Sequence, residues 1–157
     1  MKRSLAFLAG CALGCAALAQ PAHRDAPSHA TLQQAAGTKA LMAALERDIG
    51  RQDAAFDAAT RAAAARAEWS ERDRVGFLRT ILRSPANQAF DKRIASLAAE
   101  LRSLQQAVDR GEIRGAQADA RFVAQMRALI VQLRSVYERQ SVHLLQQLRE
   151  VEPAQPC

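Results

Sequence analysis

The chain has 157 residues, a length that favours one domain. Aromatic residues are only 4% and Gly and Pro are scarce, which argues against sandwiches and barrels because those folds need aromatic residues and frequent turns. The net charge is +6 and falls to +4 without residues 1–19, since 20 basic residues then face 16 acidic ones; no basic run with interleaved aromatic residues predicts a nucleic-acid groove.

Alanine supplies much of the apolar content of 49%. Small side chains bury little area each, so the core is expected to be thin. Together with the abundance of Leu, Gln, Arg and Glu, this composition predicts an all-α fold. We expect an elongated helical hairpin or bundle of three to four helices with coiled-coil-like seams.

Residues 1–19 resemble a secretory signal peptide that is removed on export. The chain begins with Lys2 and Arg3, and residues 4–18 are uncharged and apolar or small. An uncleaved membrane anchor is the alternative, but the stretch is shorter than the roughly 20 residues of a spanning helix. The sequence therefore predicts a bacterial envelope protein, periplasmic or secreted.

Two cleavage signals compete within this segment. The tetrapeptide LAGC, ending at Cys11, is typical of bacterial lipoproteins, whereas ALA, ending at Ala19, is typical of secreted proteins. Cleavage at Cys11 would leave an apolar region at the lower edge of the usual roughly 7–15 residues, and the tetrapeptide ending at Cys15 lacks the usual large aliphatic residue. Release after Ala19 is favoured. Lipid anchoring at Cys11 or Cys15 is the alternative, and it is the only membrane attachment expected.

The cleavage site also decides what Cys157 can do. Release after Ala19 leaves Cys157 as the only cysteine, so it is either an inert thiol on a flexible tail, residues 152–157, or the site of an intermolecular disulfide. Acylation at Cys11 would instead leave Cys15 and Cys157 as a candidate pair.

The chain is expected to continue with a flexible linker over 20–30 and a single helical domain over 31–151. Thr31 and Gln34 have the spacing of a capping box, which predicts a helix that begins at Thr31. Apolar residues then recur at spacings of three, four and seven along one helix face. They are Met42, Leu45, Ile49, Phe56, Ala59 and Ala63.

A short, strongly apolar helix is predicted next. Ser70 with Asp73 is a candidate N-cap, and Pro85 ends the helix because the residue before proline is pushed out of helical geometry. Core packing is the favoured interpretation of its large apolar side chains, and an exposed patch that binds a protein partner is the alternative. The candidate partner-binding residues are Trp69, Val75, Phe77, Leu78, Ile81 and Leu82.

Two longer helices, 88–110 and 116–151, are separated by a short turn and are expected to form an antiparallel hairpin. The seam of the first comprises Phe90, Ile94, Leu97, Leu101, Leu104 and Val108. The main seam of the second comprises Phe122, Met126, Leu129, Leu133 and Val136, and a second seam comprises Val123, Ile130, Tyr137, Leu144 and Val151. Such a broad apolar stripe suits a helix with more than one neighbour.

No catalytic, metal or cofactor site is predicted. His143 has no Glu or His three or four residues away, so it is interpreted as a polar contact between helices. Glu46 and Asp48 are interpreted as surface charges, and Arg134 with Glu138 as an ordinary i,i+4 pair. No phosphate-binding loop, nucleotide-binding glycine pattern or nucleophile elbow occurs. The chain is therefore not expected to be an enzyme.

Two functions remain open. The first is a non-enzymatic protein-binding module of the envelope, such as a chaperone, sensor or adaptor. The second is a structural coiled-coil component or lipoprotein that works by self-association, as a homo-oligomer.

Overall fold

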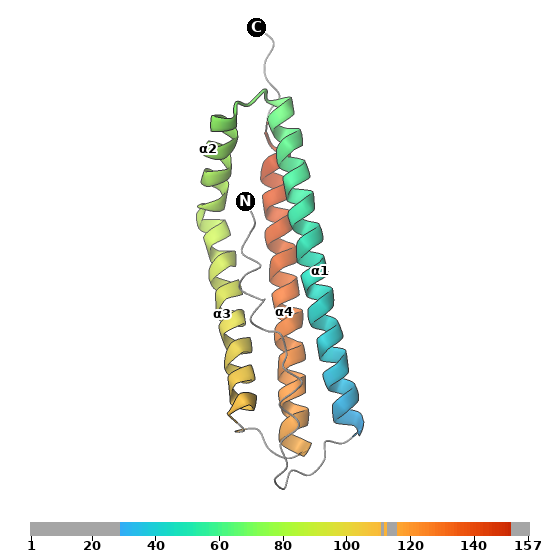
Figure 1. Cartoon of the computed structure of the whole chain (residues 1–157). Helices are drawn as coiled ribbons and strands as arrows, with labels where there is room; N and C mark the ends of the chain where they lie inside the picture. Colours follow the sequence, from blue (N-terminus) through green and yellow to red (C-terminus); the bar gives the residue numbers. More distant parts are fainter. Residues whose placement is uncertain (1–28, 111, 113–115, 152–157) are drawn as a thin grey trace. The chain divides into compact units, whose positions relative to one another are not determined.

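The computed structural model describes residues 29–110, 112 and 116–151, and every regular element within them is an α-helix. The helices follow one another as α1 (His29–Arg66), α2 (Glu71–Leu82), α3 (Pro85–Asp109) and α4 (Ala116–Arg149) (Figure 1). The prediction of an all-α fold with three to four helices is confirmed. The predicted signal peptide, most of the linker, and Cys11, Cys15 and Cys157 lie outside the described residues.

Two helices begin earlier than their sequence signals predict. α1 begins at His29, so Thr31 lies inside the helix and the predicted N-cap at Thr31 is wrong. α3 begins at Pro85, three residues before the expected start at residue 88. Proline is well suited to this first position because its missing N–H would have no helical partner there. The Ser84 Oγ caps the helix by accepting from the Asn87 backbone N–H at 3.2 Å.

The contacts divide the chain into two compact units, each built from parts of several helices. Unit 1 comprises the residues up to Glu46 and Ser96–Leu133; unit 2 comprises Arg47–Ala95 and the residues from Arg134 onward. α1, α3 and α4 each contribute to both units, and α2 lies wholly in unit 2.

The core of unit 1 comes from the predicted apolar stripes of three helices. Leu104 and Phe122 are half-buried beside it, and the side chain of Val108 lies outside the described part of the chain. The buried apolar residues are Met42 and Leu45 of α1, Leu97, Ala98 and Leu101 of α3, and Val123, Met126, Leu129, Ile130 and Leu133 of α4.

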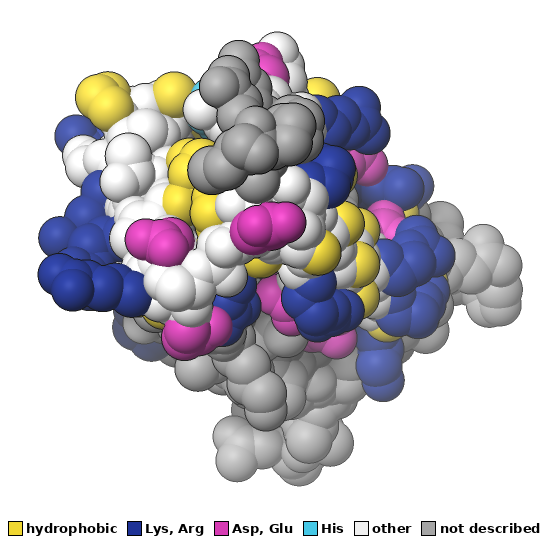
Figure 2. Space-filling model, turned by 90° about the horizontal axis from the view of Figure 1, so that it is seen from above, with side chains coloured by type: hydrophobic (Ala, Val, Ile, Leu, Met, Phe, Trp, Pro, Cys, Tyr) yellow, Lys and Arg dark blue, Asp and Glu magenta, His cyan; other side chains and the backbone are white. Residues whose placement is uncertain are grey.

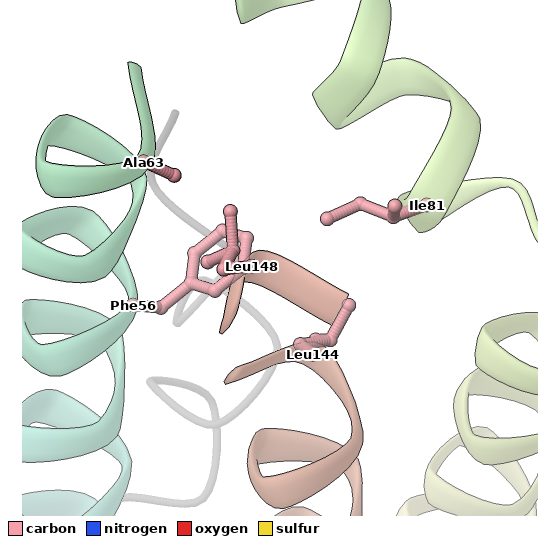
Figure 3. Packing of buried hydrophobic residues seen from close by; sticks show 5 residues of the cluster. All are labelled: Phe56, Ala63, Ile81, Leu144 and Leu148. Carbon is pink, nitrogen blue, oxygen red and sulfur yellow. The ribbon is translucent and has the colours of Figure 1, made fainter. Parts of the chain in front are cut away.

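The core of unit 2 is a cluster in which α1, α2 and α4 meet. Phe56 and Ala63 of α1 point toward Leu144 and Leu148 of α4, and Ile81 of α2 approaches the same leucines (Figure 3). The Arg66 guanidinium joins α1 to α4 by donating to the backbone carbonyl of Leu148 at 3.0 Å. Half-buried apolar residues surround the cluster; they are Ala59, Trp69, Phe77, Leu78, Leu82 and Val151.

A buried polar network links α3 to α4 in unit 2. The Gln140 Nε2 donates to Asn87 Oδ1 at 2.9 Å and to Asp91 Oδ1 at 2.7 Å. The Asn87 Nδ2 donates to the backbone carbonyl of Leu82, at the end of α2, at 2.9 Å. Gln140 of α4 is thereby tied to the break between α2 and α3. The contact places the start of α3 beside the later part of α4, as an antiparallel hairpin requires.

The interpretation of Asp48 as a surface charge is wrong. Its side chain is only 12% exposed and accepts from Arg134 of α4 at 3.0 Å, while Arg51 on its own helix also pairs with it. Arg134 in turn makes the predicted pair with Glu138 at 3.0 Å. Guanidinium groups from both helices therefore contact this carboxylate.

Candidate protein-binding surface on α2

α2 owes its start to a capping box between Ser70 and Asp73. The Ser70 Oγ accepts from the Asp73 backbone N–H at 3.2 Å, and the Asp73 carboxylate accepts from the Ser70 backbone N–H at 3.1 Å and from its hydroxyl at 2.6 Å. The N-cap predicted from sequence is therefore present. The Ser70 hydrogen bonds hold the pKa of Asp73 below its usual range.

One face of α2 belongs to the core. Ile81 is only 6% exposed, and Leu78 and Leu82 pack half-buried against the same cluster. These positions recur at spacings of three and four, as expected for the inner side of an amphipathic helix. Trp69 and Phe77 pack against the cluster as well, so five of the six predicted partner-binding residues contact the interior of unit 2 and Val75 is the exception.

Trp69 and residues in the first part of α2 line an open hollow. Trp69 and Phe77 lie at its wall with ring centroids 4.7 Å apart and planes inclined at 41°. Both rings also pack against the core cluster, so their positions are fixed from behind. The hollow is lined by Trp69, Glu71, Arg72, Asp73, Val75, Gly76, Phe77 and Arg79.

A stripe of four residues runs along the hollow. Arg72, Val75, Gly76 and Arg79 stand at spacings of three, four and seven, which places them on one face of α2. All four are exposed, Val75 at 36%. The face therefore has a guanidinium toward each end and a small apolar surface between them.

The charges on the rim are not equivalent. The Glu71 carboxylate is engaged by Arg74, whose Nε and Nη2 donate to it at 2.9 and 2.6 Å; these bonds lower the pKa of Glu71 and raise that of Arg74. By contrast, neither Arg72 nor Arg79 makes an ion pair with any described residue. Figure 2 shows that Lys and Arg side chains stand in several separate groups, with acidic side chains between them, on the face viewed there.

The structure thus divides the predicted partner-binding residues into two sets. Trp69, Val75 and Phe77 line the hollow, whereas Leu78, Ile81 and Leu82 do not. The apolar pattern in the sequence did not identify Arg72, Gly76 and Arg79, because none of them is a large apolar residue. Their i, i+4, i+7 spacing with Arg at both ends is the signal that could have found them.

The remaining candidates lie elsewhere in the fold. His143 of α4 faces Phe90 of α3, with ring centroids 6.0 Å apart, and the polar contact between these helices is made by Gln140 instead. Among the described residues, no group of three or more His, Cys, Asp or Glu side chains is placed to hold a metal ion. None of the helices described has both the length and the apolar character needed to cross a bilayer.

Comparison with known proteins adds no assignment. The chain matches no protein-family model, no curated protein and no solved structure. The candidate surface is therefore defined by its geometry alone.

Proposed function

We propose that this chain is an exported, non-enzymatic protein of the bacterial envelope that binds a segment of another protein in the hollow on α2. The proposal rests on one observation: the Trp69–Phe77 pair is held by the core of unit 2 and still lines an open hollow. Export rests on the signal-like residues 1–19.

A surface of this kind suits protein recognition for a physical reason. Aromatic side chains and arginines dominate the energetics of protein interfaces, and an anchor that is already ordered loses little entropy when a partner binds. The rings of Trp69 and Phe77 are ordered by packing, while Val75 adds exposed apolar surface beside them. The hollow therefore offers a rigid apolar floor that a partner side chain could cover.

Self-association is the second candidate function, and α4 favours it. Val131 and Val142 are large apolar residues on this helix that stay 56% and 66% exposed. In this alternative they would lie at an interface between coiled-coil helices of two copies, with Cys157 or a lipid at Cys11 or Cys15 assisting the assembly.

A matched pair of valine substitutions tests the proposed function. Peptides that bind the purified chain are first selected from a randomised display library. Their affinity is then measured for the natural chain and for the variants Val75→Ser and Val142→Ser. Serine and valine have similar helix propensities, so helical circular dichroism should be unchanged in both variants. We expect Val75→Ser to weaken binding of the selected peptides about tenfold, because an apolar anchor is lost, and Val142→Ser to leave it unchanged.

The two variants also define the contrary result. Equal binding of the selected peptides to both variants would show that the hollow is not their site. A selection that yields no binding peptide would contradict the proposed function. The variants Leu78→Ser and Leu82→Ser are not used here because both side chains pack against the core, so that a loss of binding would also follow from a loss of fold.

A further inference from the structure

We propose that the partner segment is acidic as well as apolar, with an apolar side chain seated in the hollow and carboxylates bound to Arg72 and Arg79. This inference rests on the proposed function and names the chemistry of the segment that the hollow would bind. It is carried by the charge pattern along the outer stripe of α2.

The unequal pairing of the rim charges selects an acidic partner. The Glu71 carboxylate pairs with Arg74, whereas the Asp73 carboxylate accepts from the neutral Ser70 and is also attracted by the charge of Arg72. The guanidiniums of Arg72 and Arg79 are left without an ion pair among the described residues. A carboxylate that binds a guanidinium in two parallel hydrogen bonds gains both energy and orientation.

The spacing of the two arginines sets the spacing of the partner's charges. Arg79 lies seven positions after Arg72 in the helix, which corresponds to about 10 Å along the helix axis. An extended chain covers about 10 Å in three residues, so carboxylates about three residues apart on the partner could reach both guanidiniums. Val75 and Gly76 lie between the two arginines, where the partner's apolar side chain would be placed.

Gly76 keeps the middle of this stripe open. Glycine is unfavourable inside a helix, and a Cβ added at Gly76 would meet no heavy atom within 4 Å. The packing of the chain therefore does not require glycine at this position. Gly50 of α1 is equally unhindered and exposed and does not line the hollow, which makes it a matched control.

A protein segment fits these observations better than a lipid surface. The acidic residues Glu71 and Asp73 line the same hollow as the apolar side chains and the two arginines. A flat anionic membrane would bring its headgroups against these carboxylates, whereas a single chain can place its charges selectively on the arginines.

The test uses two synthetic ten-residue peptides that share a central Leu and Phe. One carries two Glu residues on each side of this centre, and the other carries Lys at the same four positions. Binding is followed by the fluorescence of Trp69, which is the only tryptophan in the chain and lines the hollow. We expect the acidic peptide to bind at least tenfold more tightly than the basic one, with an advantage that shrinks as salt screens the charges.

Two pairs of variants locate the interaction. Arg79→Glu should abolish or reverse the preference for the acidic peptide, whereas Arg149→Glu, at the end of α4, should preserve it. Gly76→Gln should weaken binding about tenfold by filling the hollow, whereas Gly50→Gln should not. Unchanged helical circular dichroism in each variant shows that the fold is retained.

Three results would overturn the inference. Equal or tighter binding of the basic peptide would show that the segment is not acidic. The proposed function would still stand in that case if Val75→Ser weakened binding of the selected library peptides. The inference would also be overturned if neither designed peptide bound to the chain. Binding of phosphatidylglycerol vesicles, lost in Arg79→Glu and without peptide binding, would assign the stripe to a membrane surface.

Discussion

Glu68 has a backbone conformation that glycine adopts more easily. It follows α1 with a φ of 51°, in the left-handed region where a Cβ is crowded by the following carbonyl. The Trp69 backbone N–H donates to the Ala64 carbonyl at 2.9 Å, a bond that closes the end of the helix. The residue that positions Trp69 beside the hollow is therefore strained.

Glycine at this position should stabilise the protein. We expect Glu68→Gly to raise the free energy of unfolding by about 1 kcal/mol, because the loss of strain exceeds the entropic cost of glycine in the unfolded chain. The midpoint of urea unfolding measures the change. Glu68→Ala serves as the control, since it removes the same carboxylate but keeps a Cβ and should give no such gain. Equal midpoints for the two variants would contradict the role given to backbone strain.

Individual polar contacts show which features could be predicted from the sequence and which could not. The i,i+4 pair Arg134–Glu138 and the Ser70 cap depend only on local spacing, and both are present. Asp48 and Gln140 form their contacts across helices, with Arg134 and with Asn87. No local pattern specifies which polar side chain will face a neighbouring helix, so these contacts required the structure.

α2 is the element on which the proposed function depends. Its inner side contributes one buried residue, Ile81, and its start is held by the exposed capping box. Elements with few buried apolar contacts open locally more readily than the rest of a fold. The first turn of α2 therefore reports on this helix separately from the core of unit 2.

Acid should loosen the first turn of α2. The pKa of Asp73 lies below its ordinary value of 3.8 because Ser70 donates to the carboxylate, so its stabilising contribution is present above that value and is lost as the pH falls through the lowered pKa. The pKa of Glu71 is lowered in the same direction by Arg74. We expect amide exchange in residues 71–74, corrected for its intrinsic pH dependence, to rise relative to that of α4 only below about pH 4.

Asp73→Asn is the control for this pH dependence. Asparagine does not titrate, so the variant should show faster exchange at pH 7, and its difference from the natural chain should shrink as Asp73 becomes protonated. A difference that stays constant from pH 7 to pH 2 would show that the charge of Asp73 does not hold the helix start.

Local sequence signals predicted each helix. They did not predict which residues of α2 pack in the core and which line the hollow. The predicted apolar stripes include most of the buried apolar residues of α1, α3 and α4, because a 3.6-residue period repeats over many turns, but Phe90, Ile94 and Leu104 are only half-buried. α2 has only 12 residues, and most of its large apolar side chains lie within 75–82. So short a pattern could not separate Ile81, in the core, from Val75, in the hollow.

At the scale of the whole molecule, the chain comprises two units that each have buried apolar residues. The polar network between α3 and α4 and the candidate surface on α2 both belong to unit 2. Composition predicted the all-α class because propensity summed over the chain is informative. It could not predict a hollow, since that feature depends on where the side chains of Trp69 and α2 lie.

We propose that the chain works by binding a different protein through α2 rather than by associating with itself. Multi-angle light scattering of the purified chain, under reducing conditions so that Cys157 cannot link chains, distinguishes these two modes. We expect a monodisperse species with the mass of one chain across micromolar concentrations. A stable dimer or larger oligomer under these conditions would contradict it and support the self-association of α4.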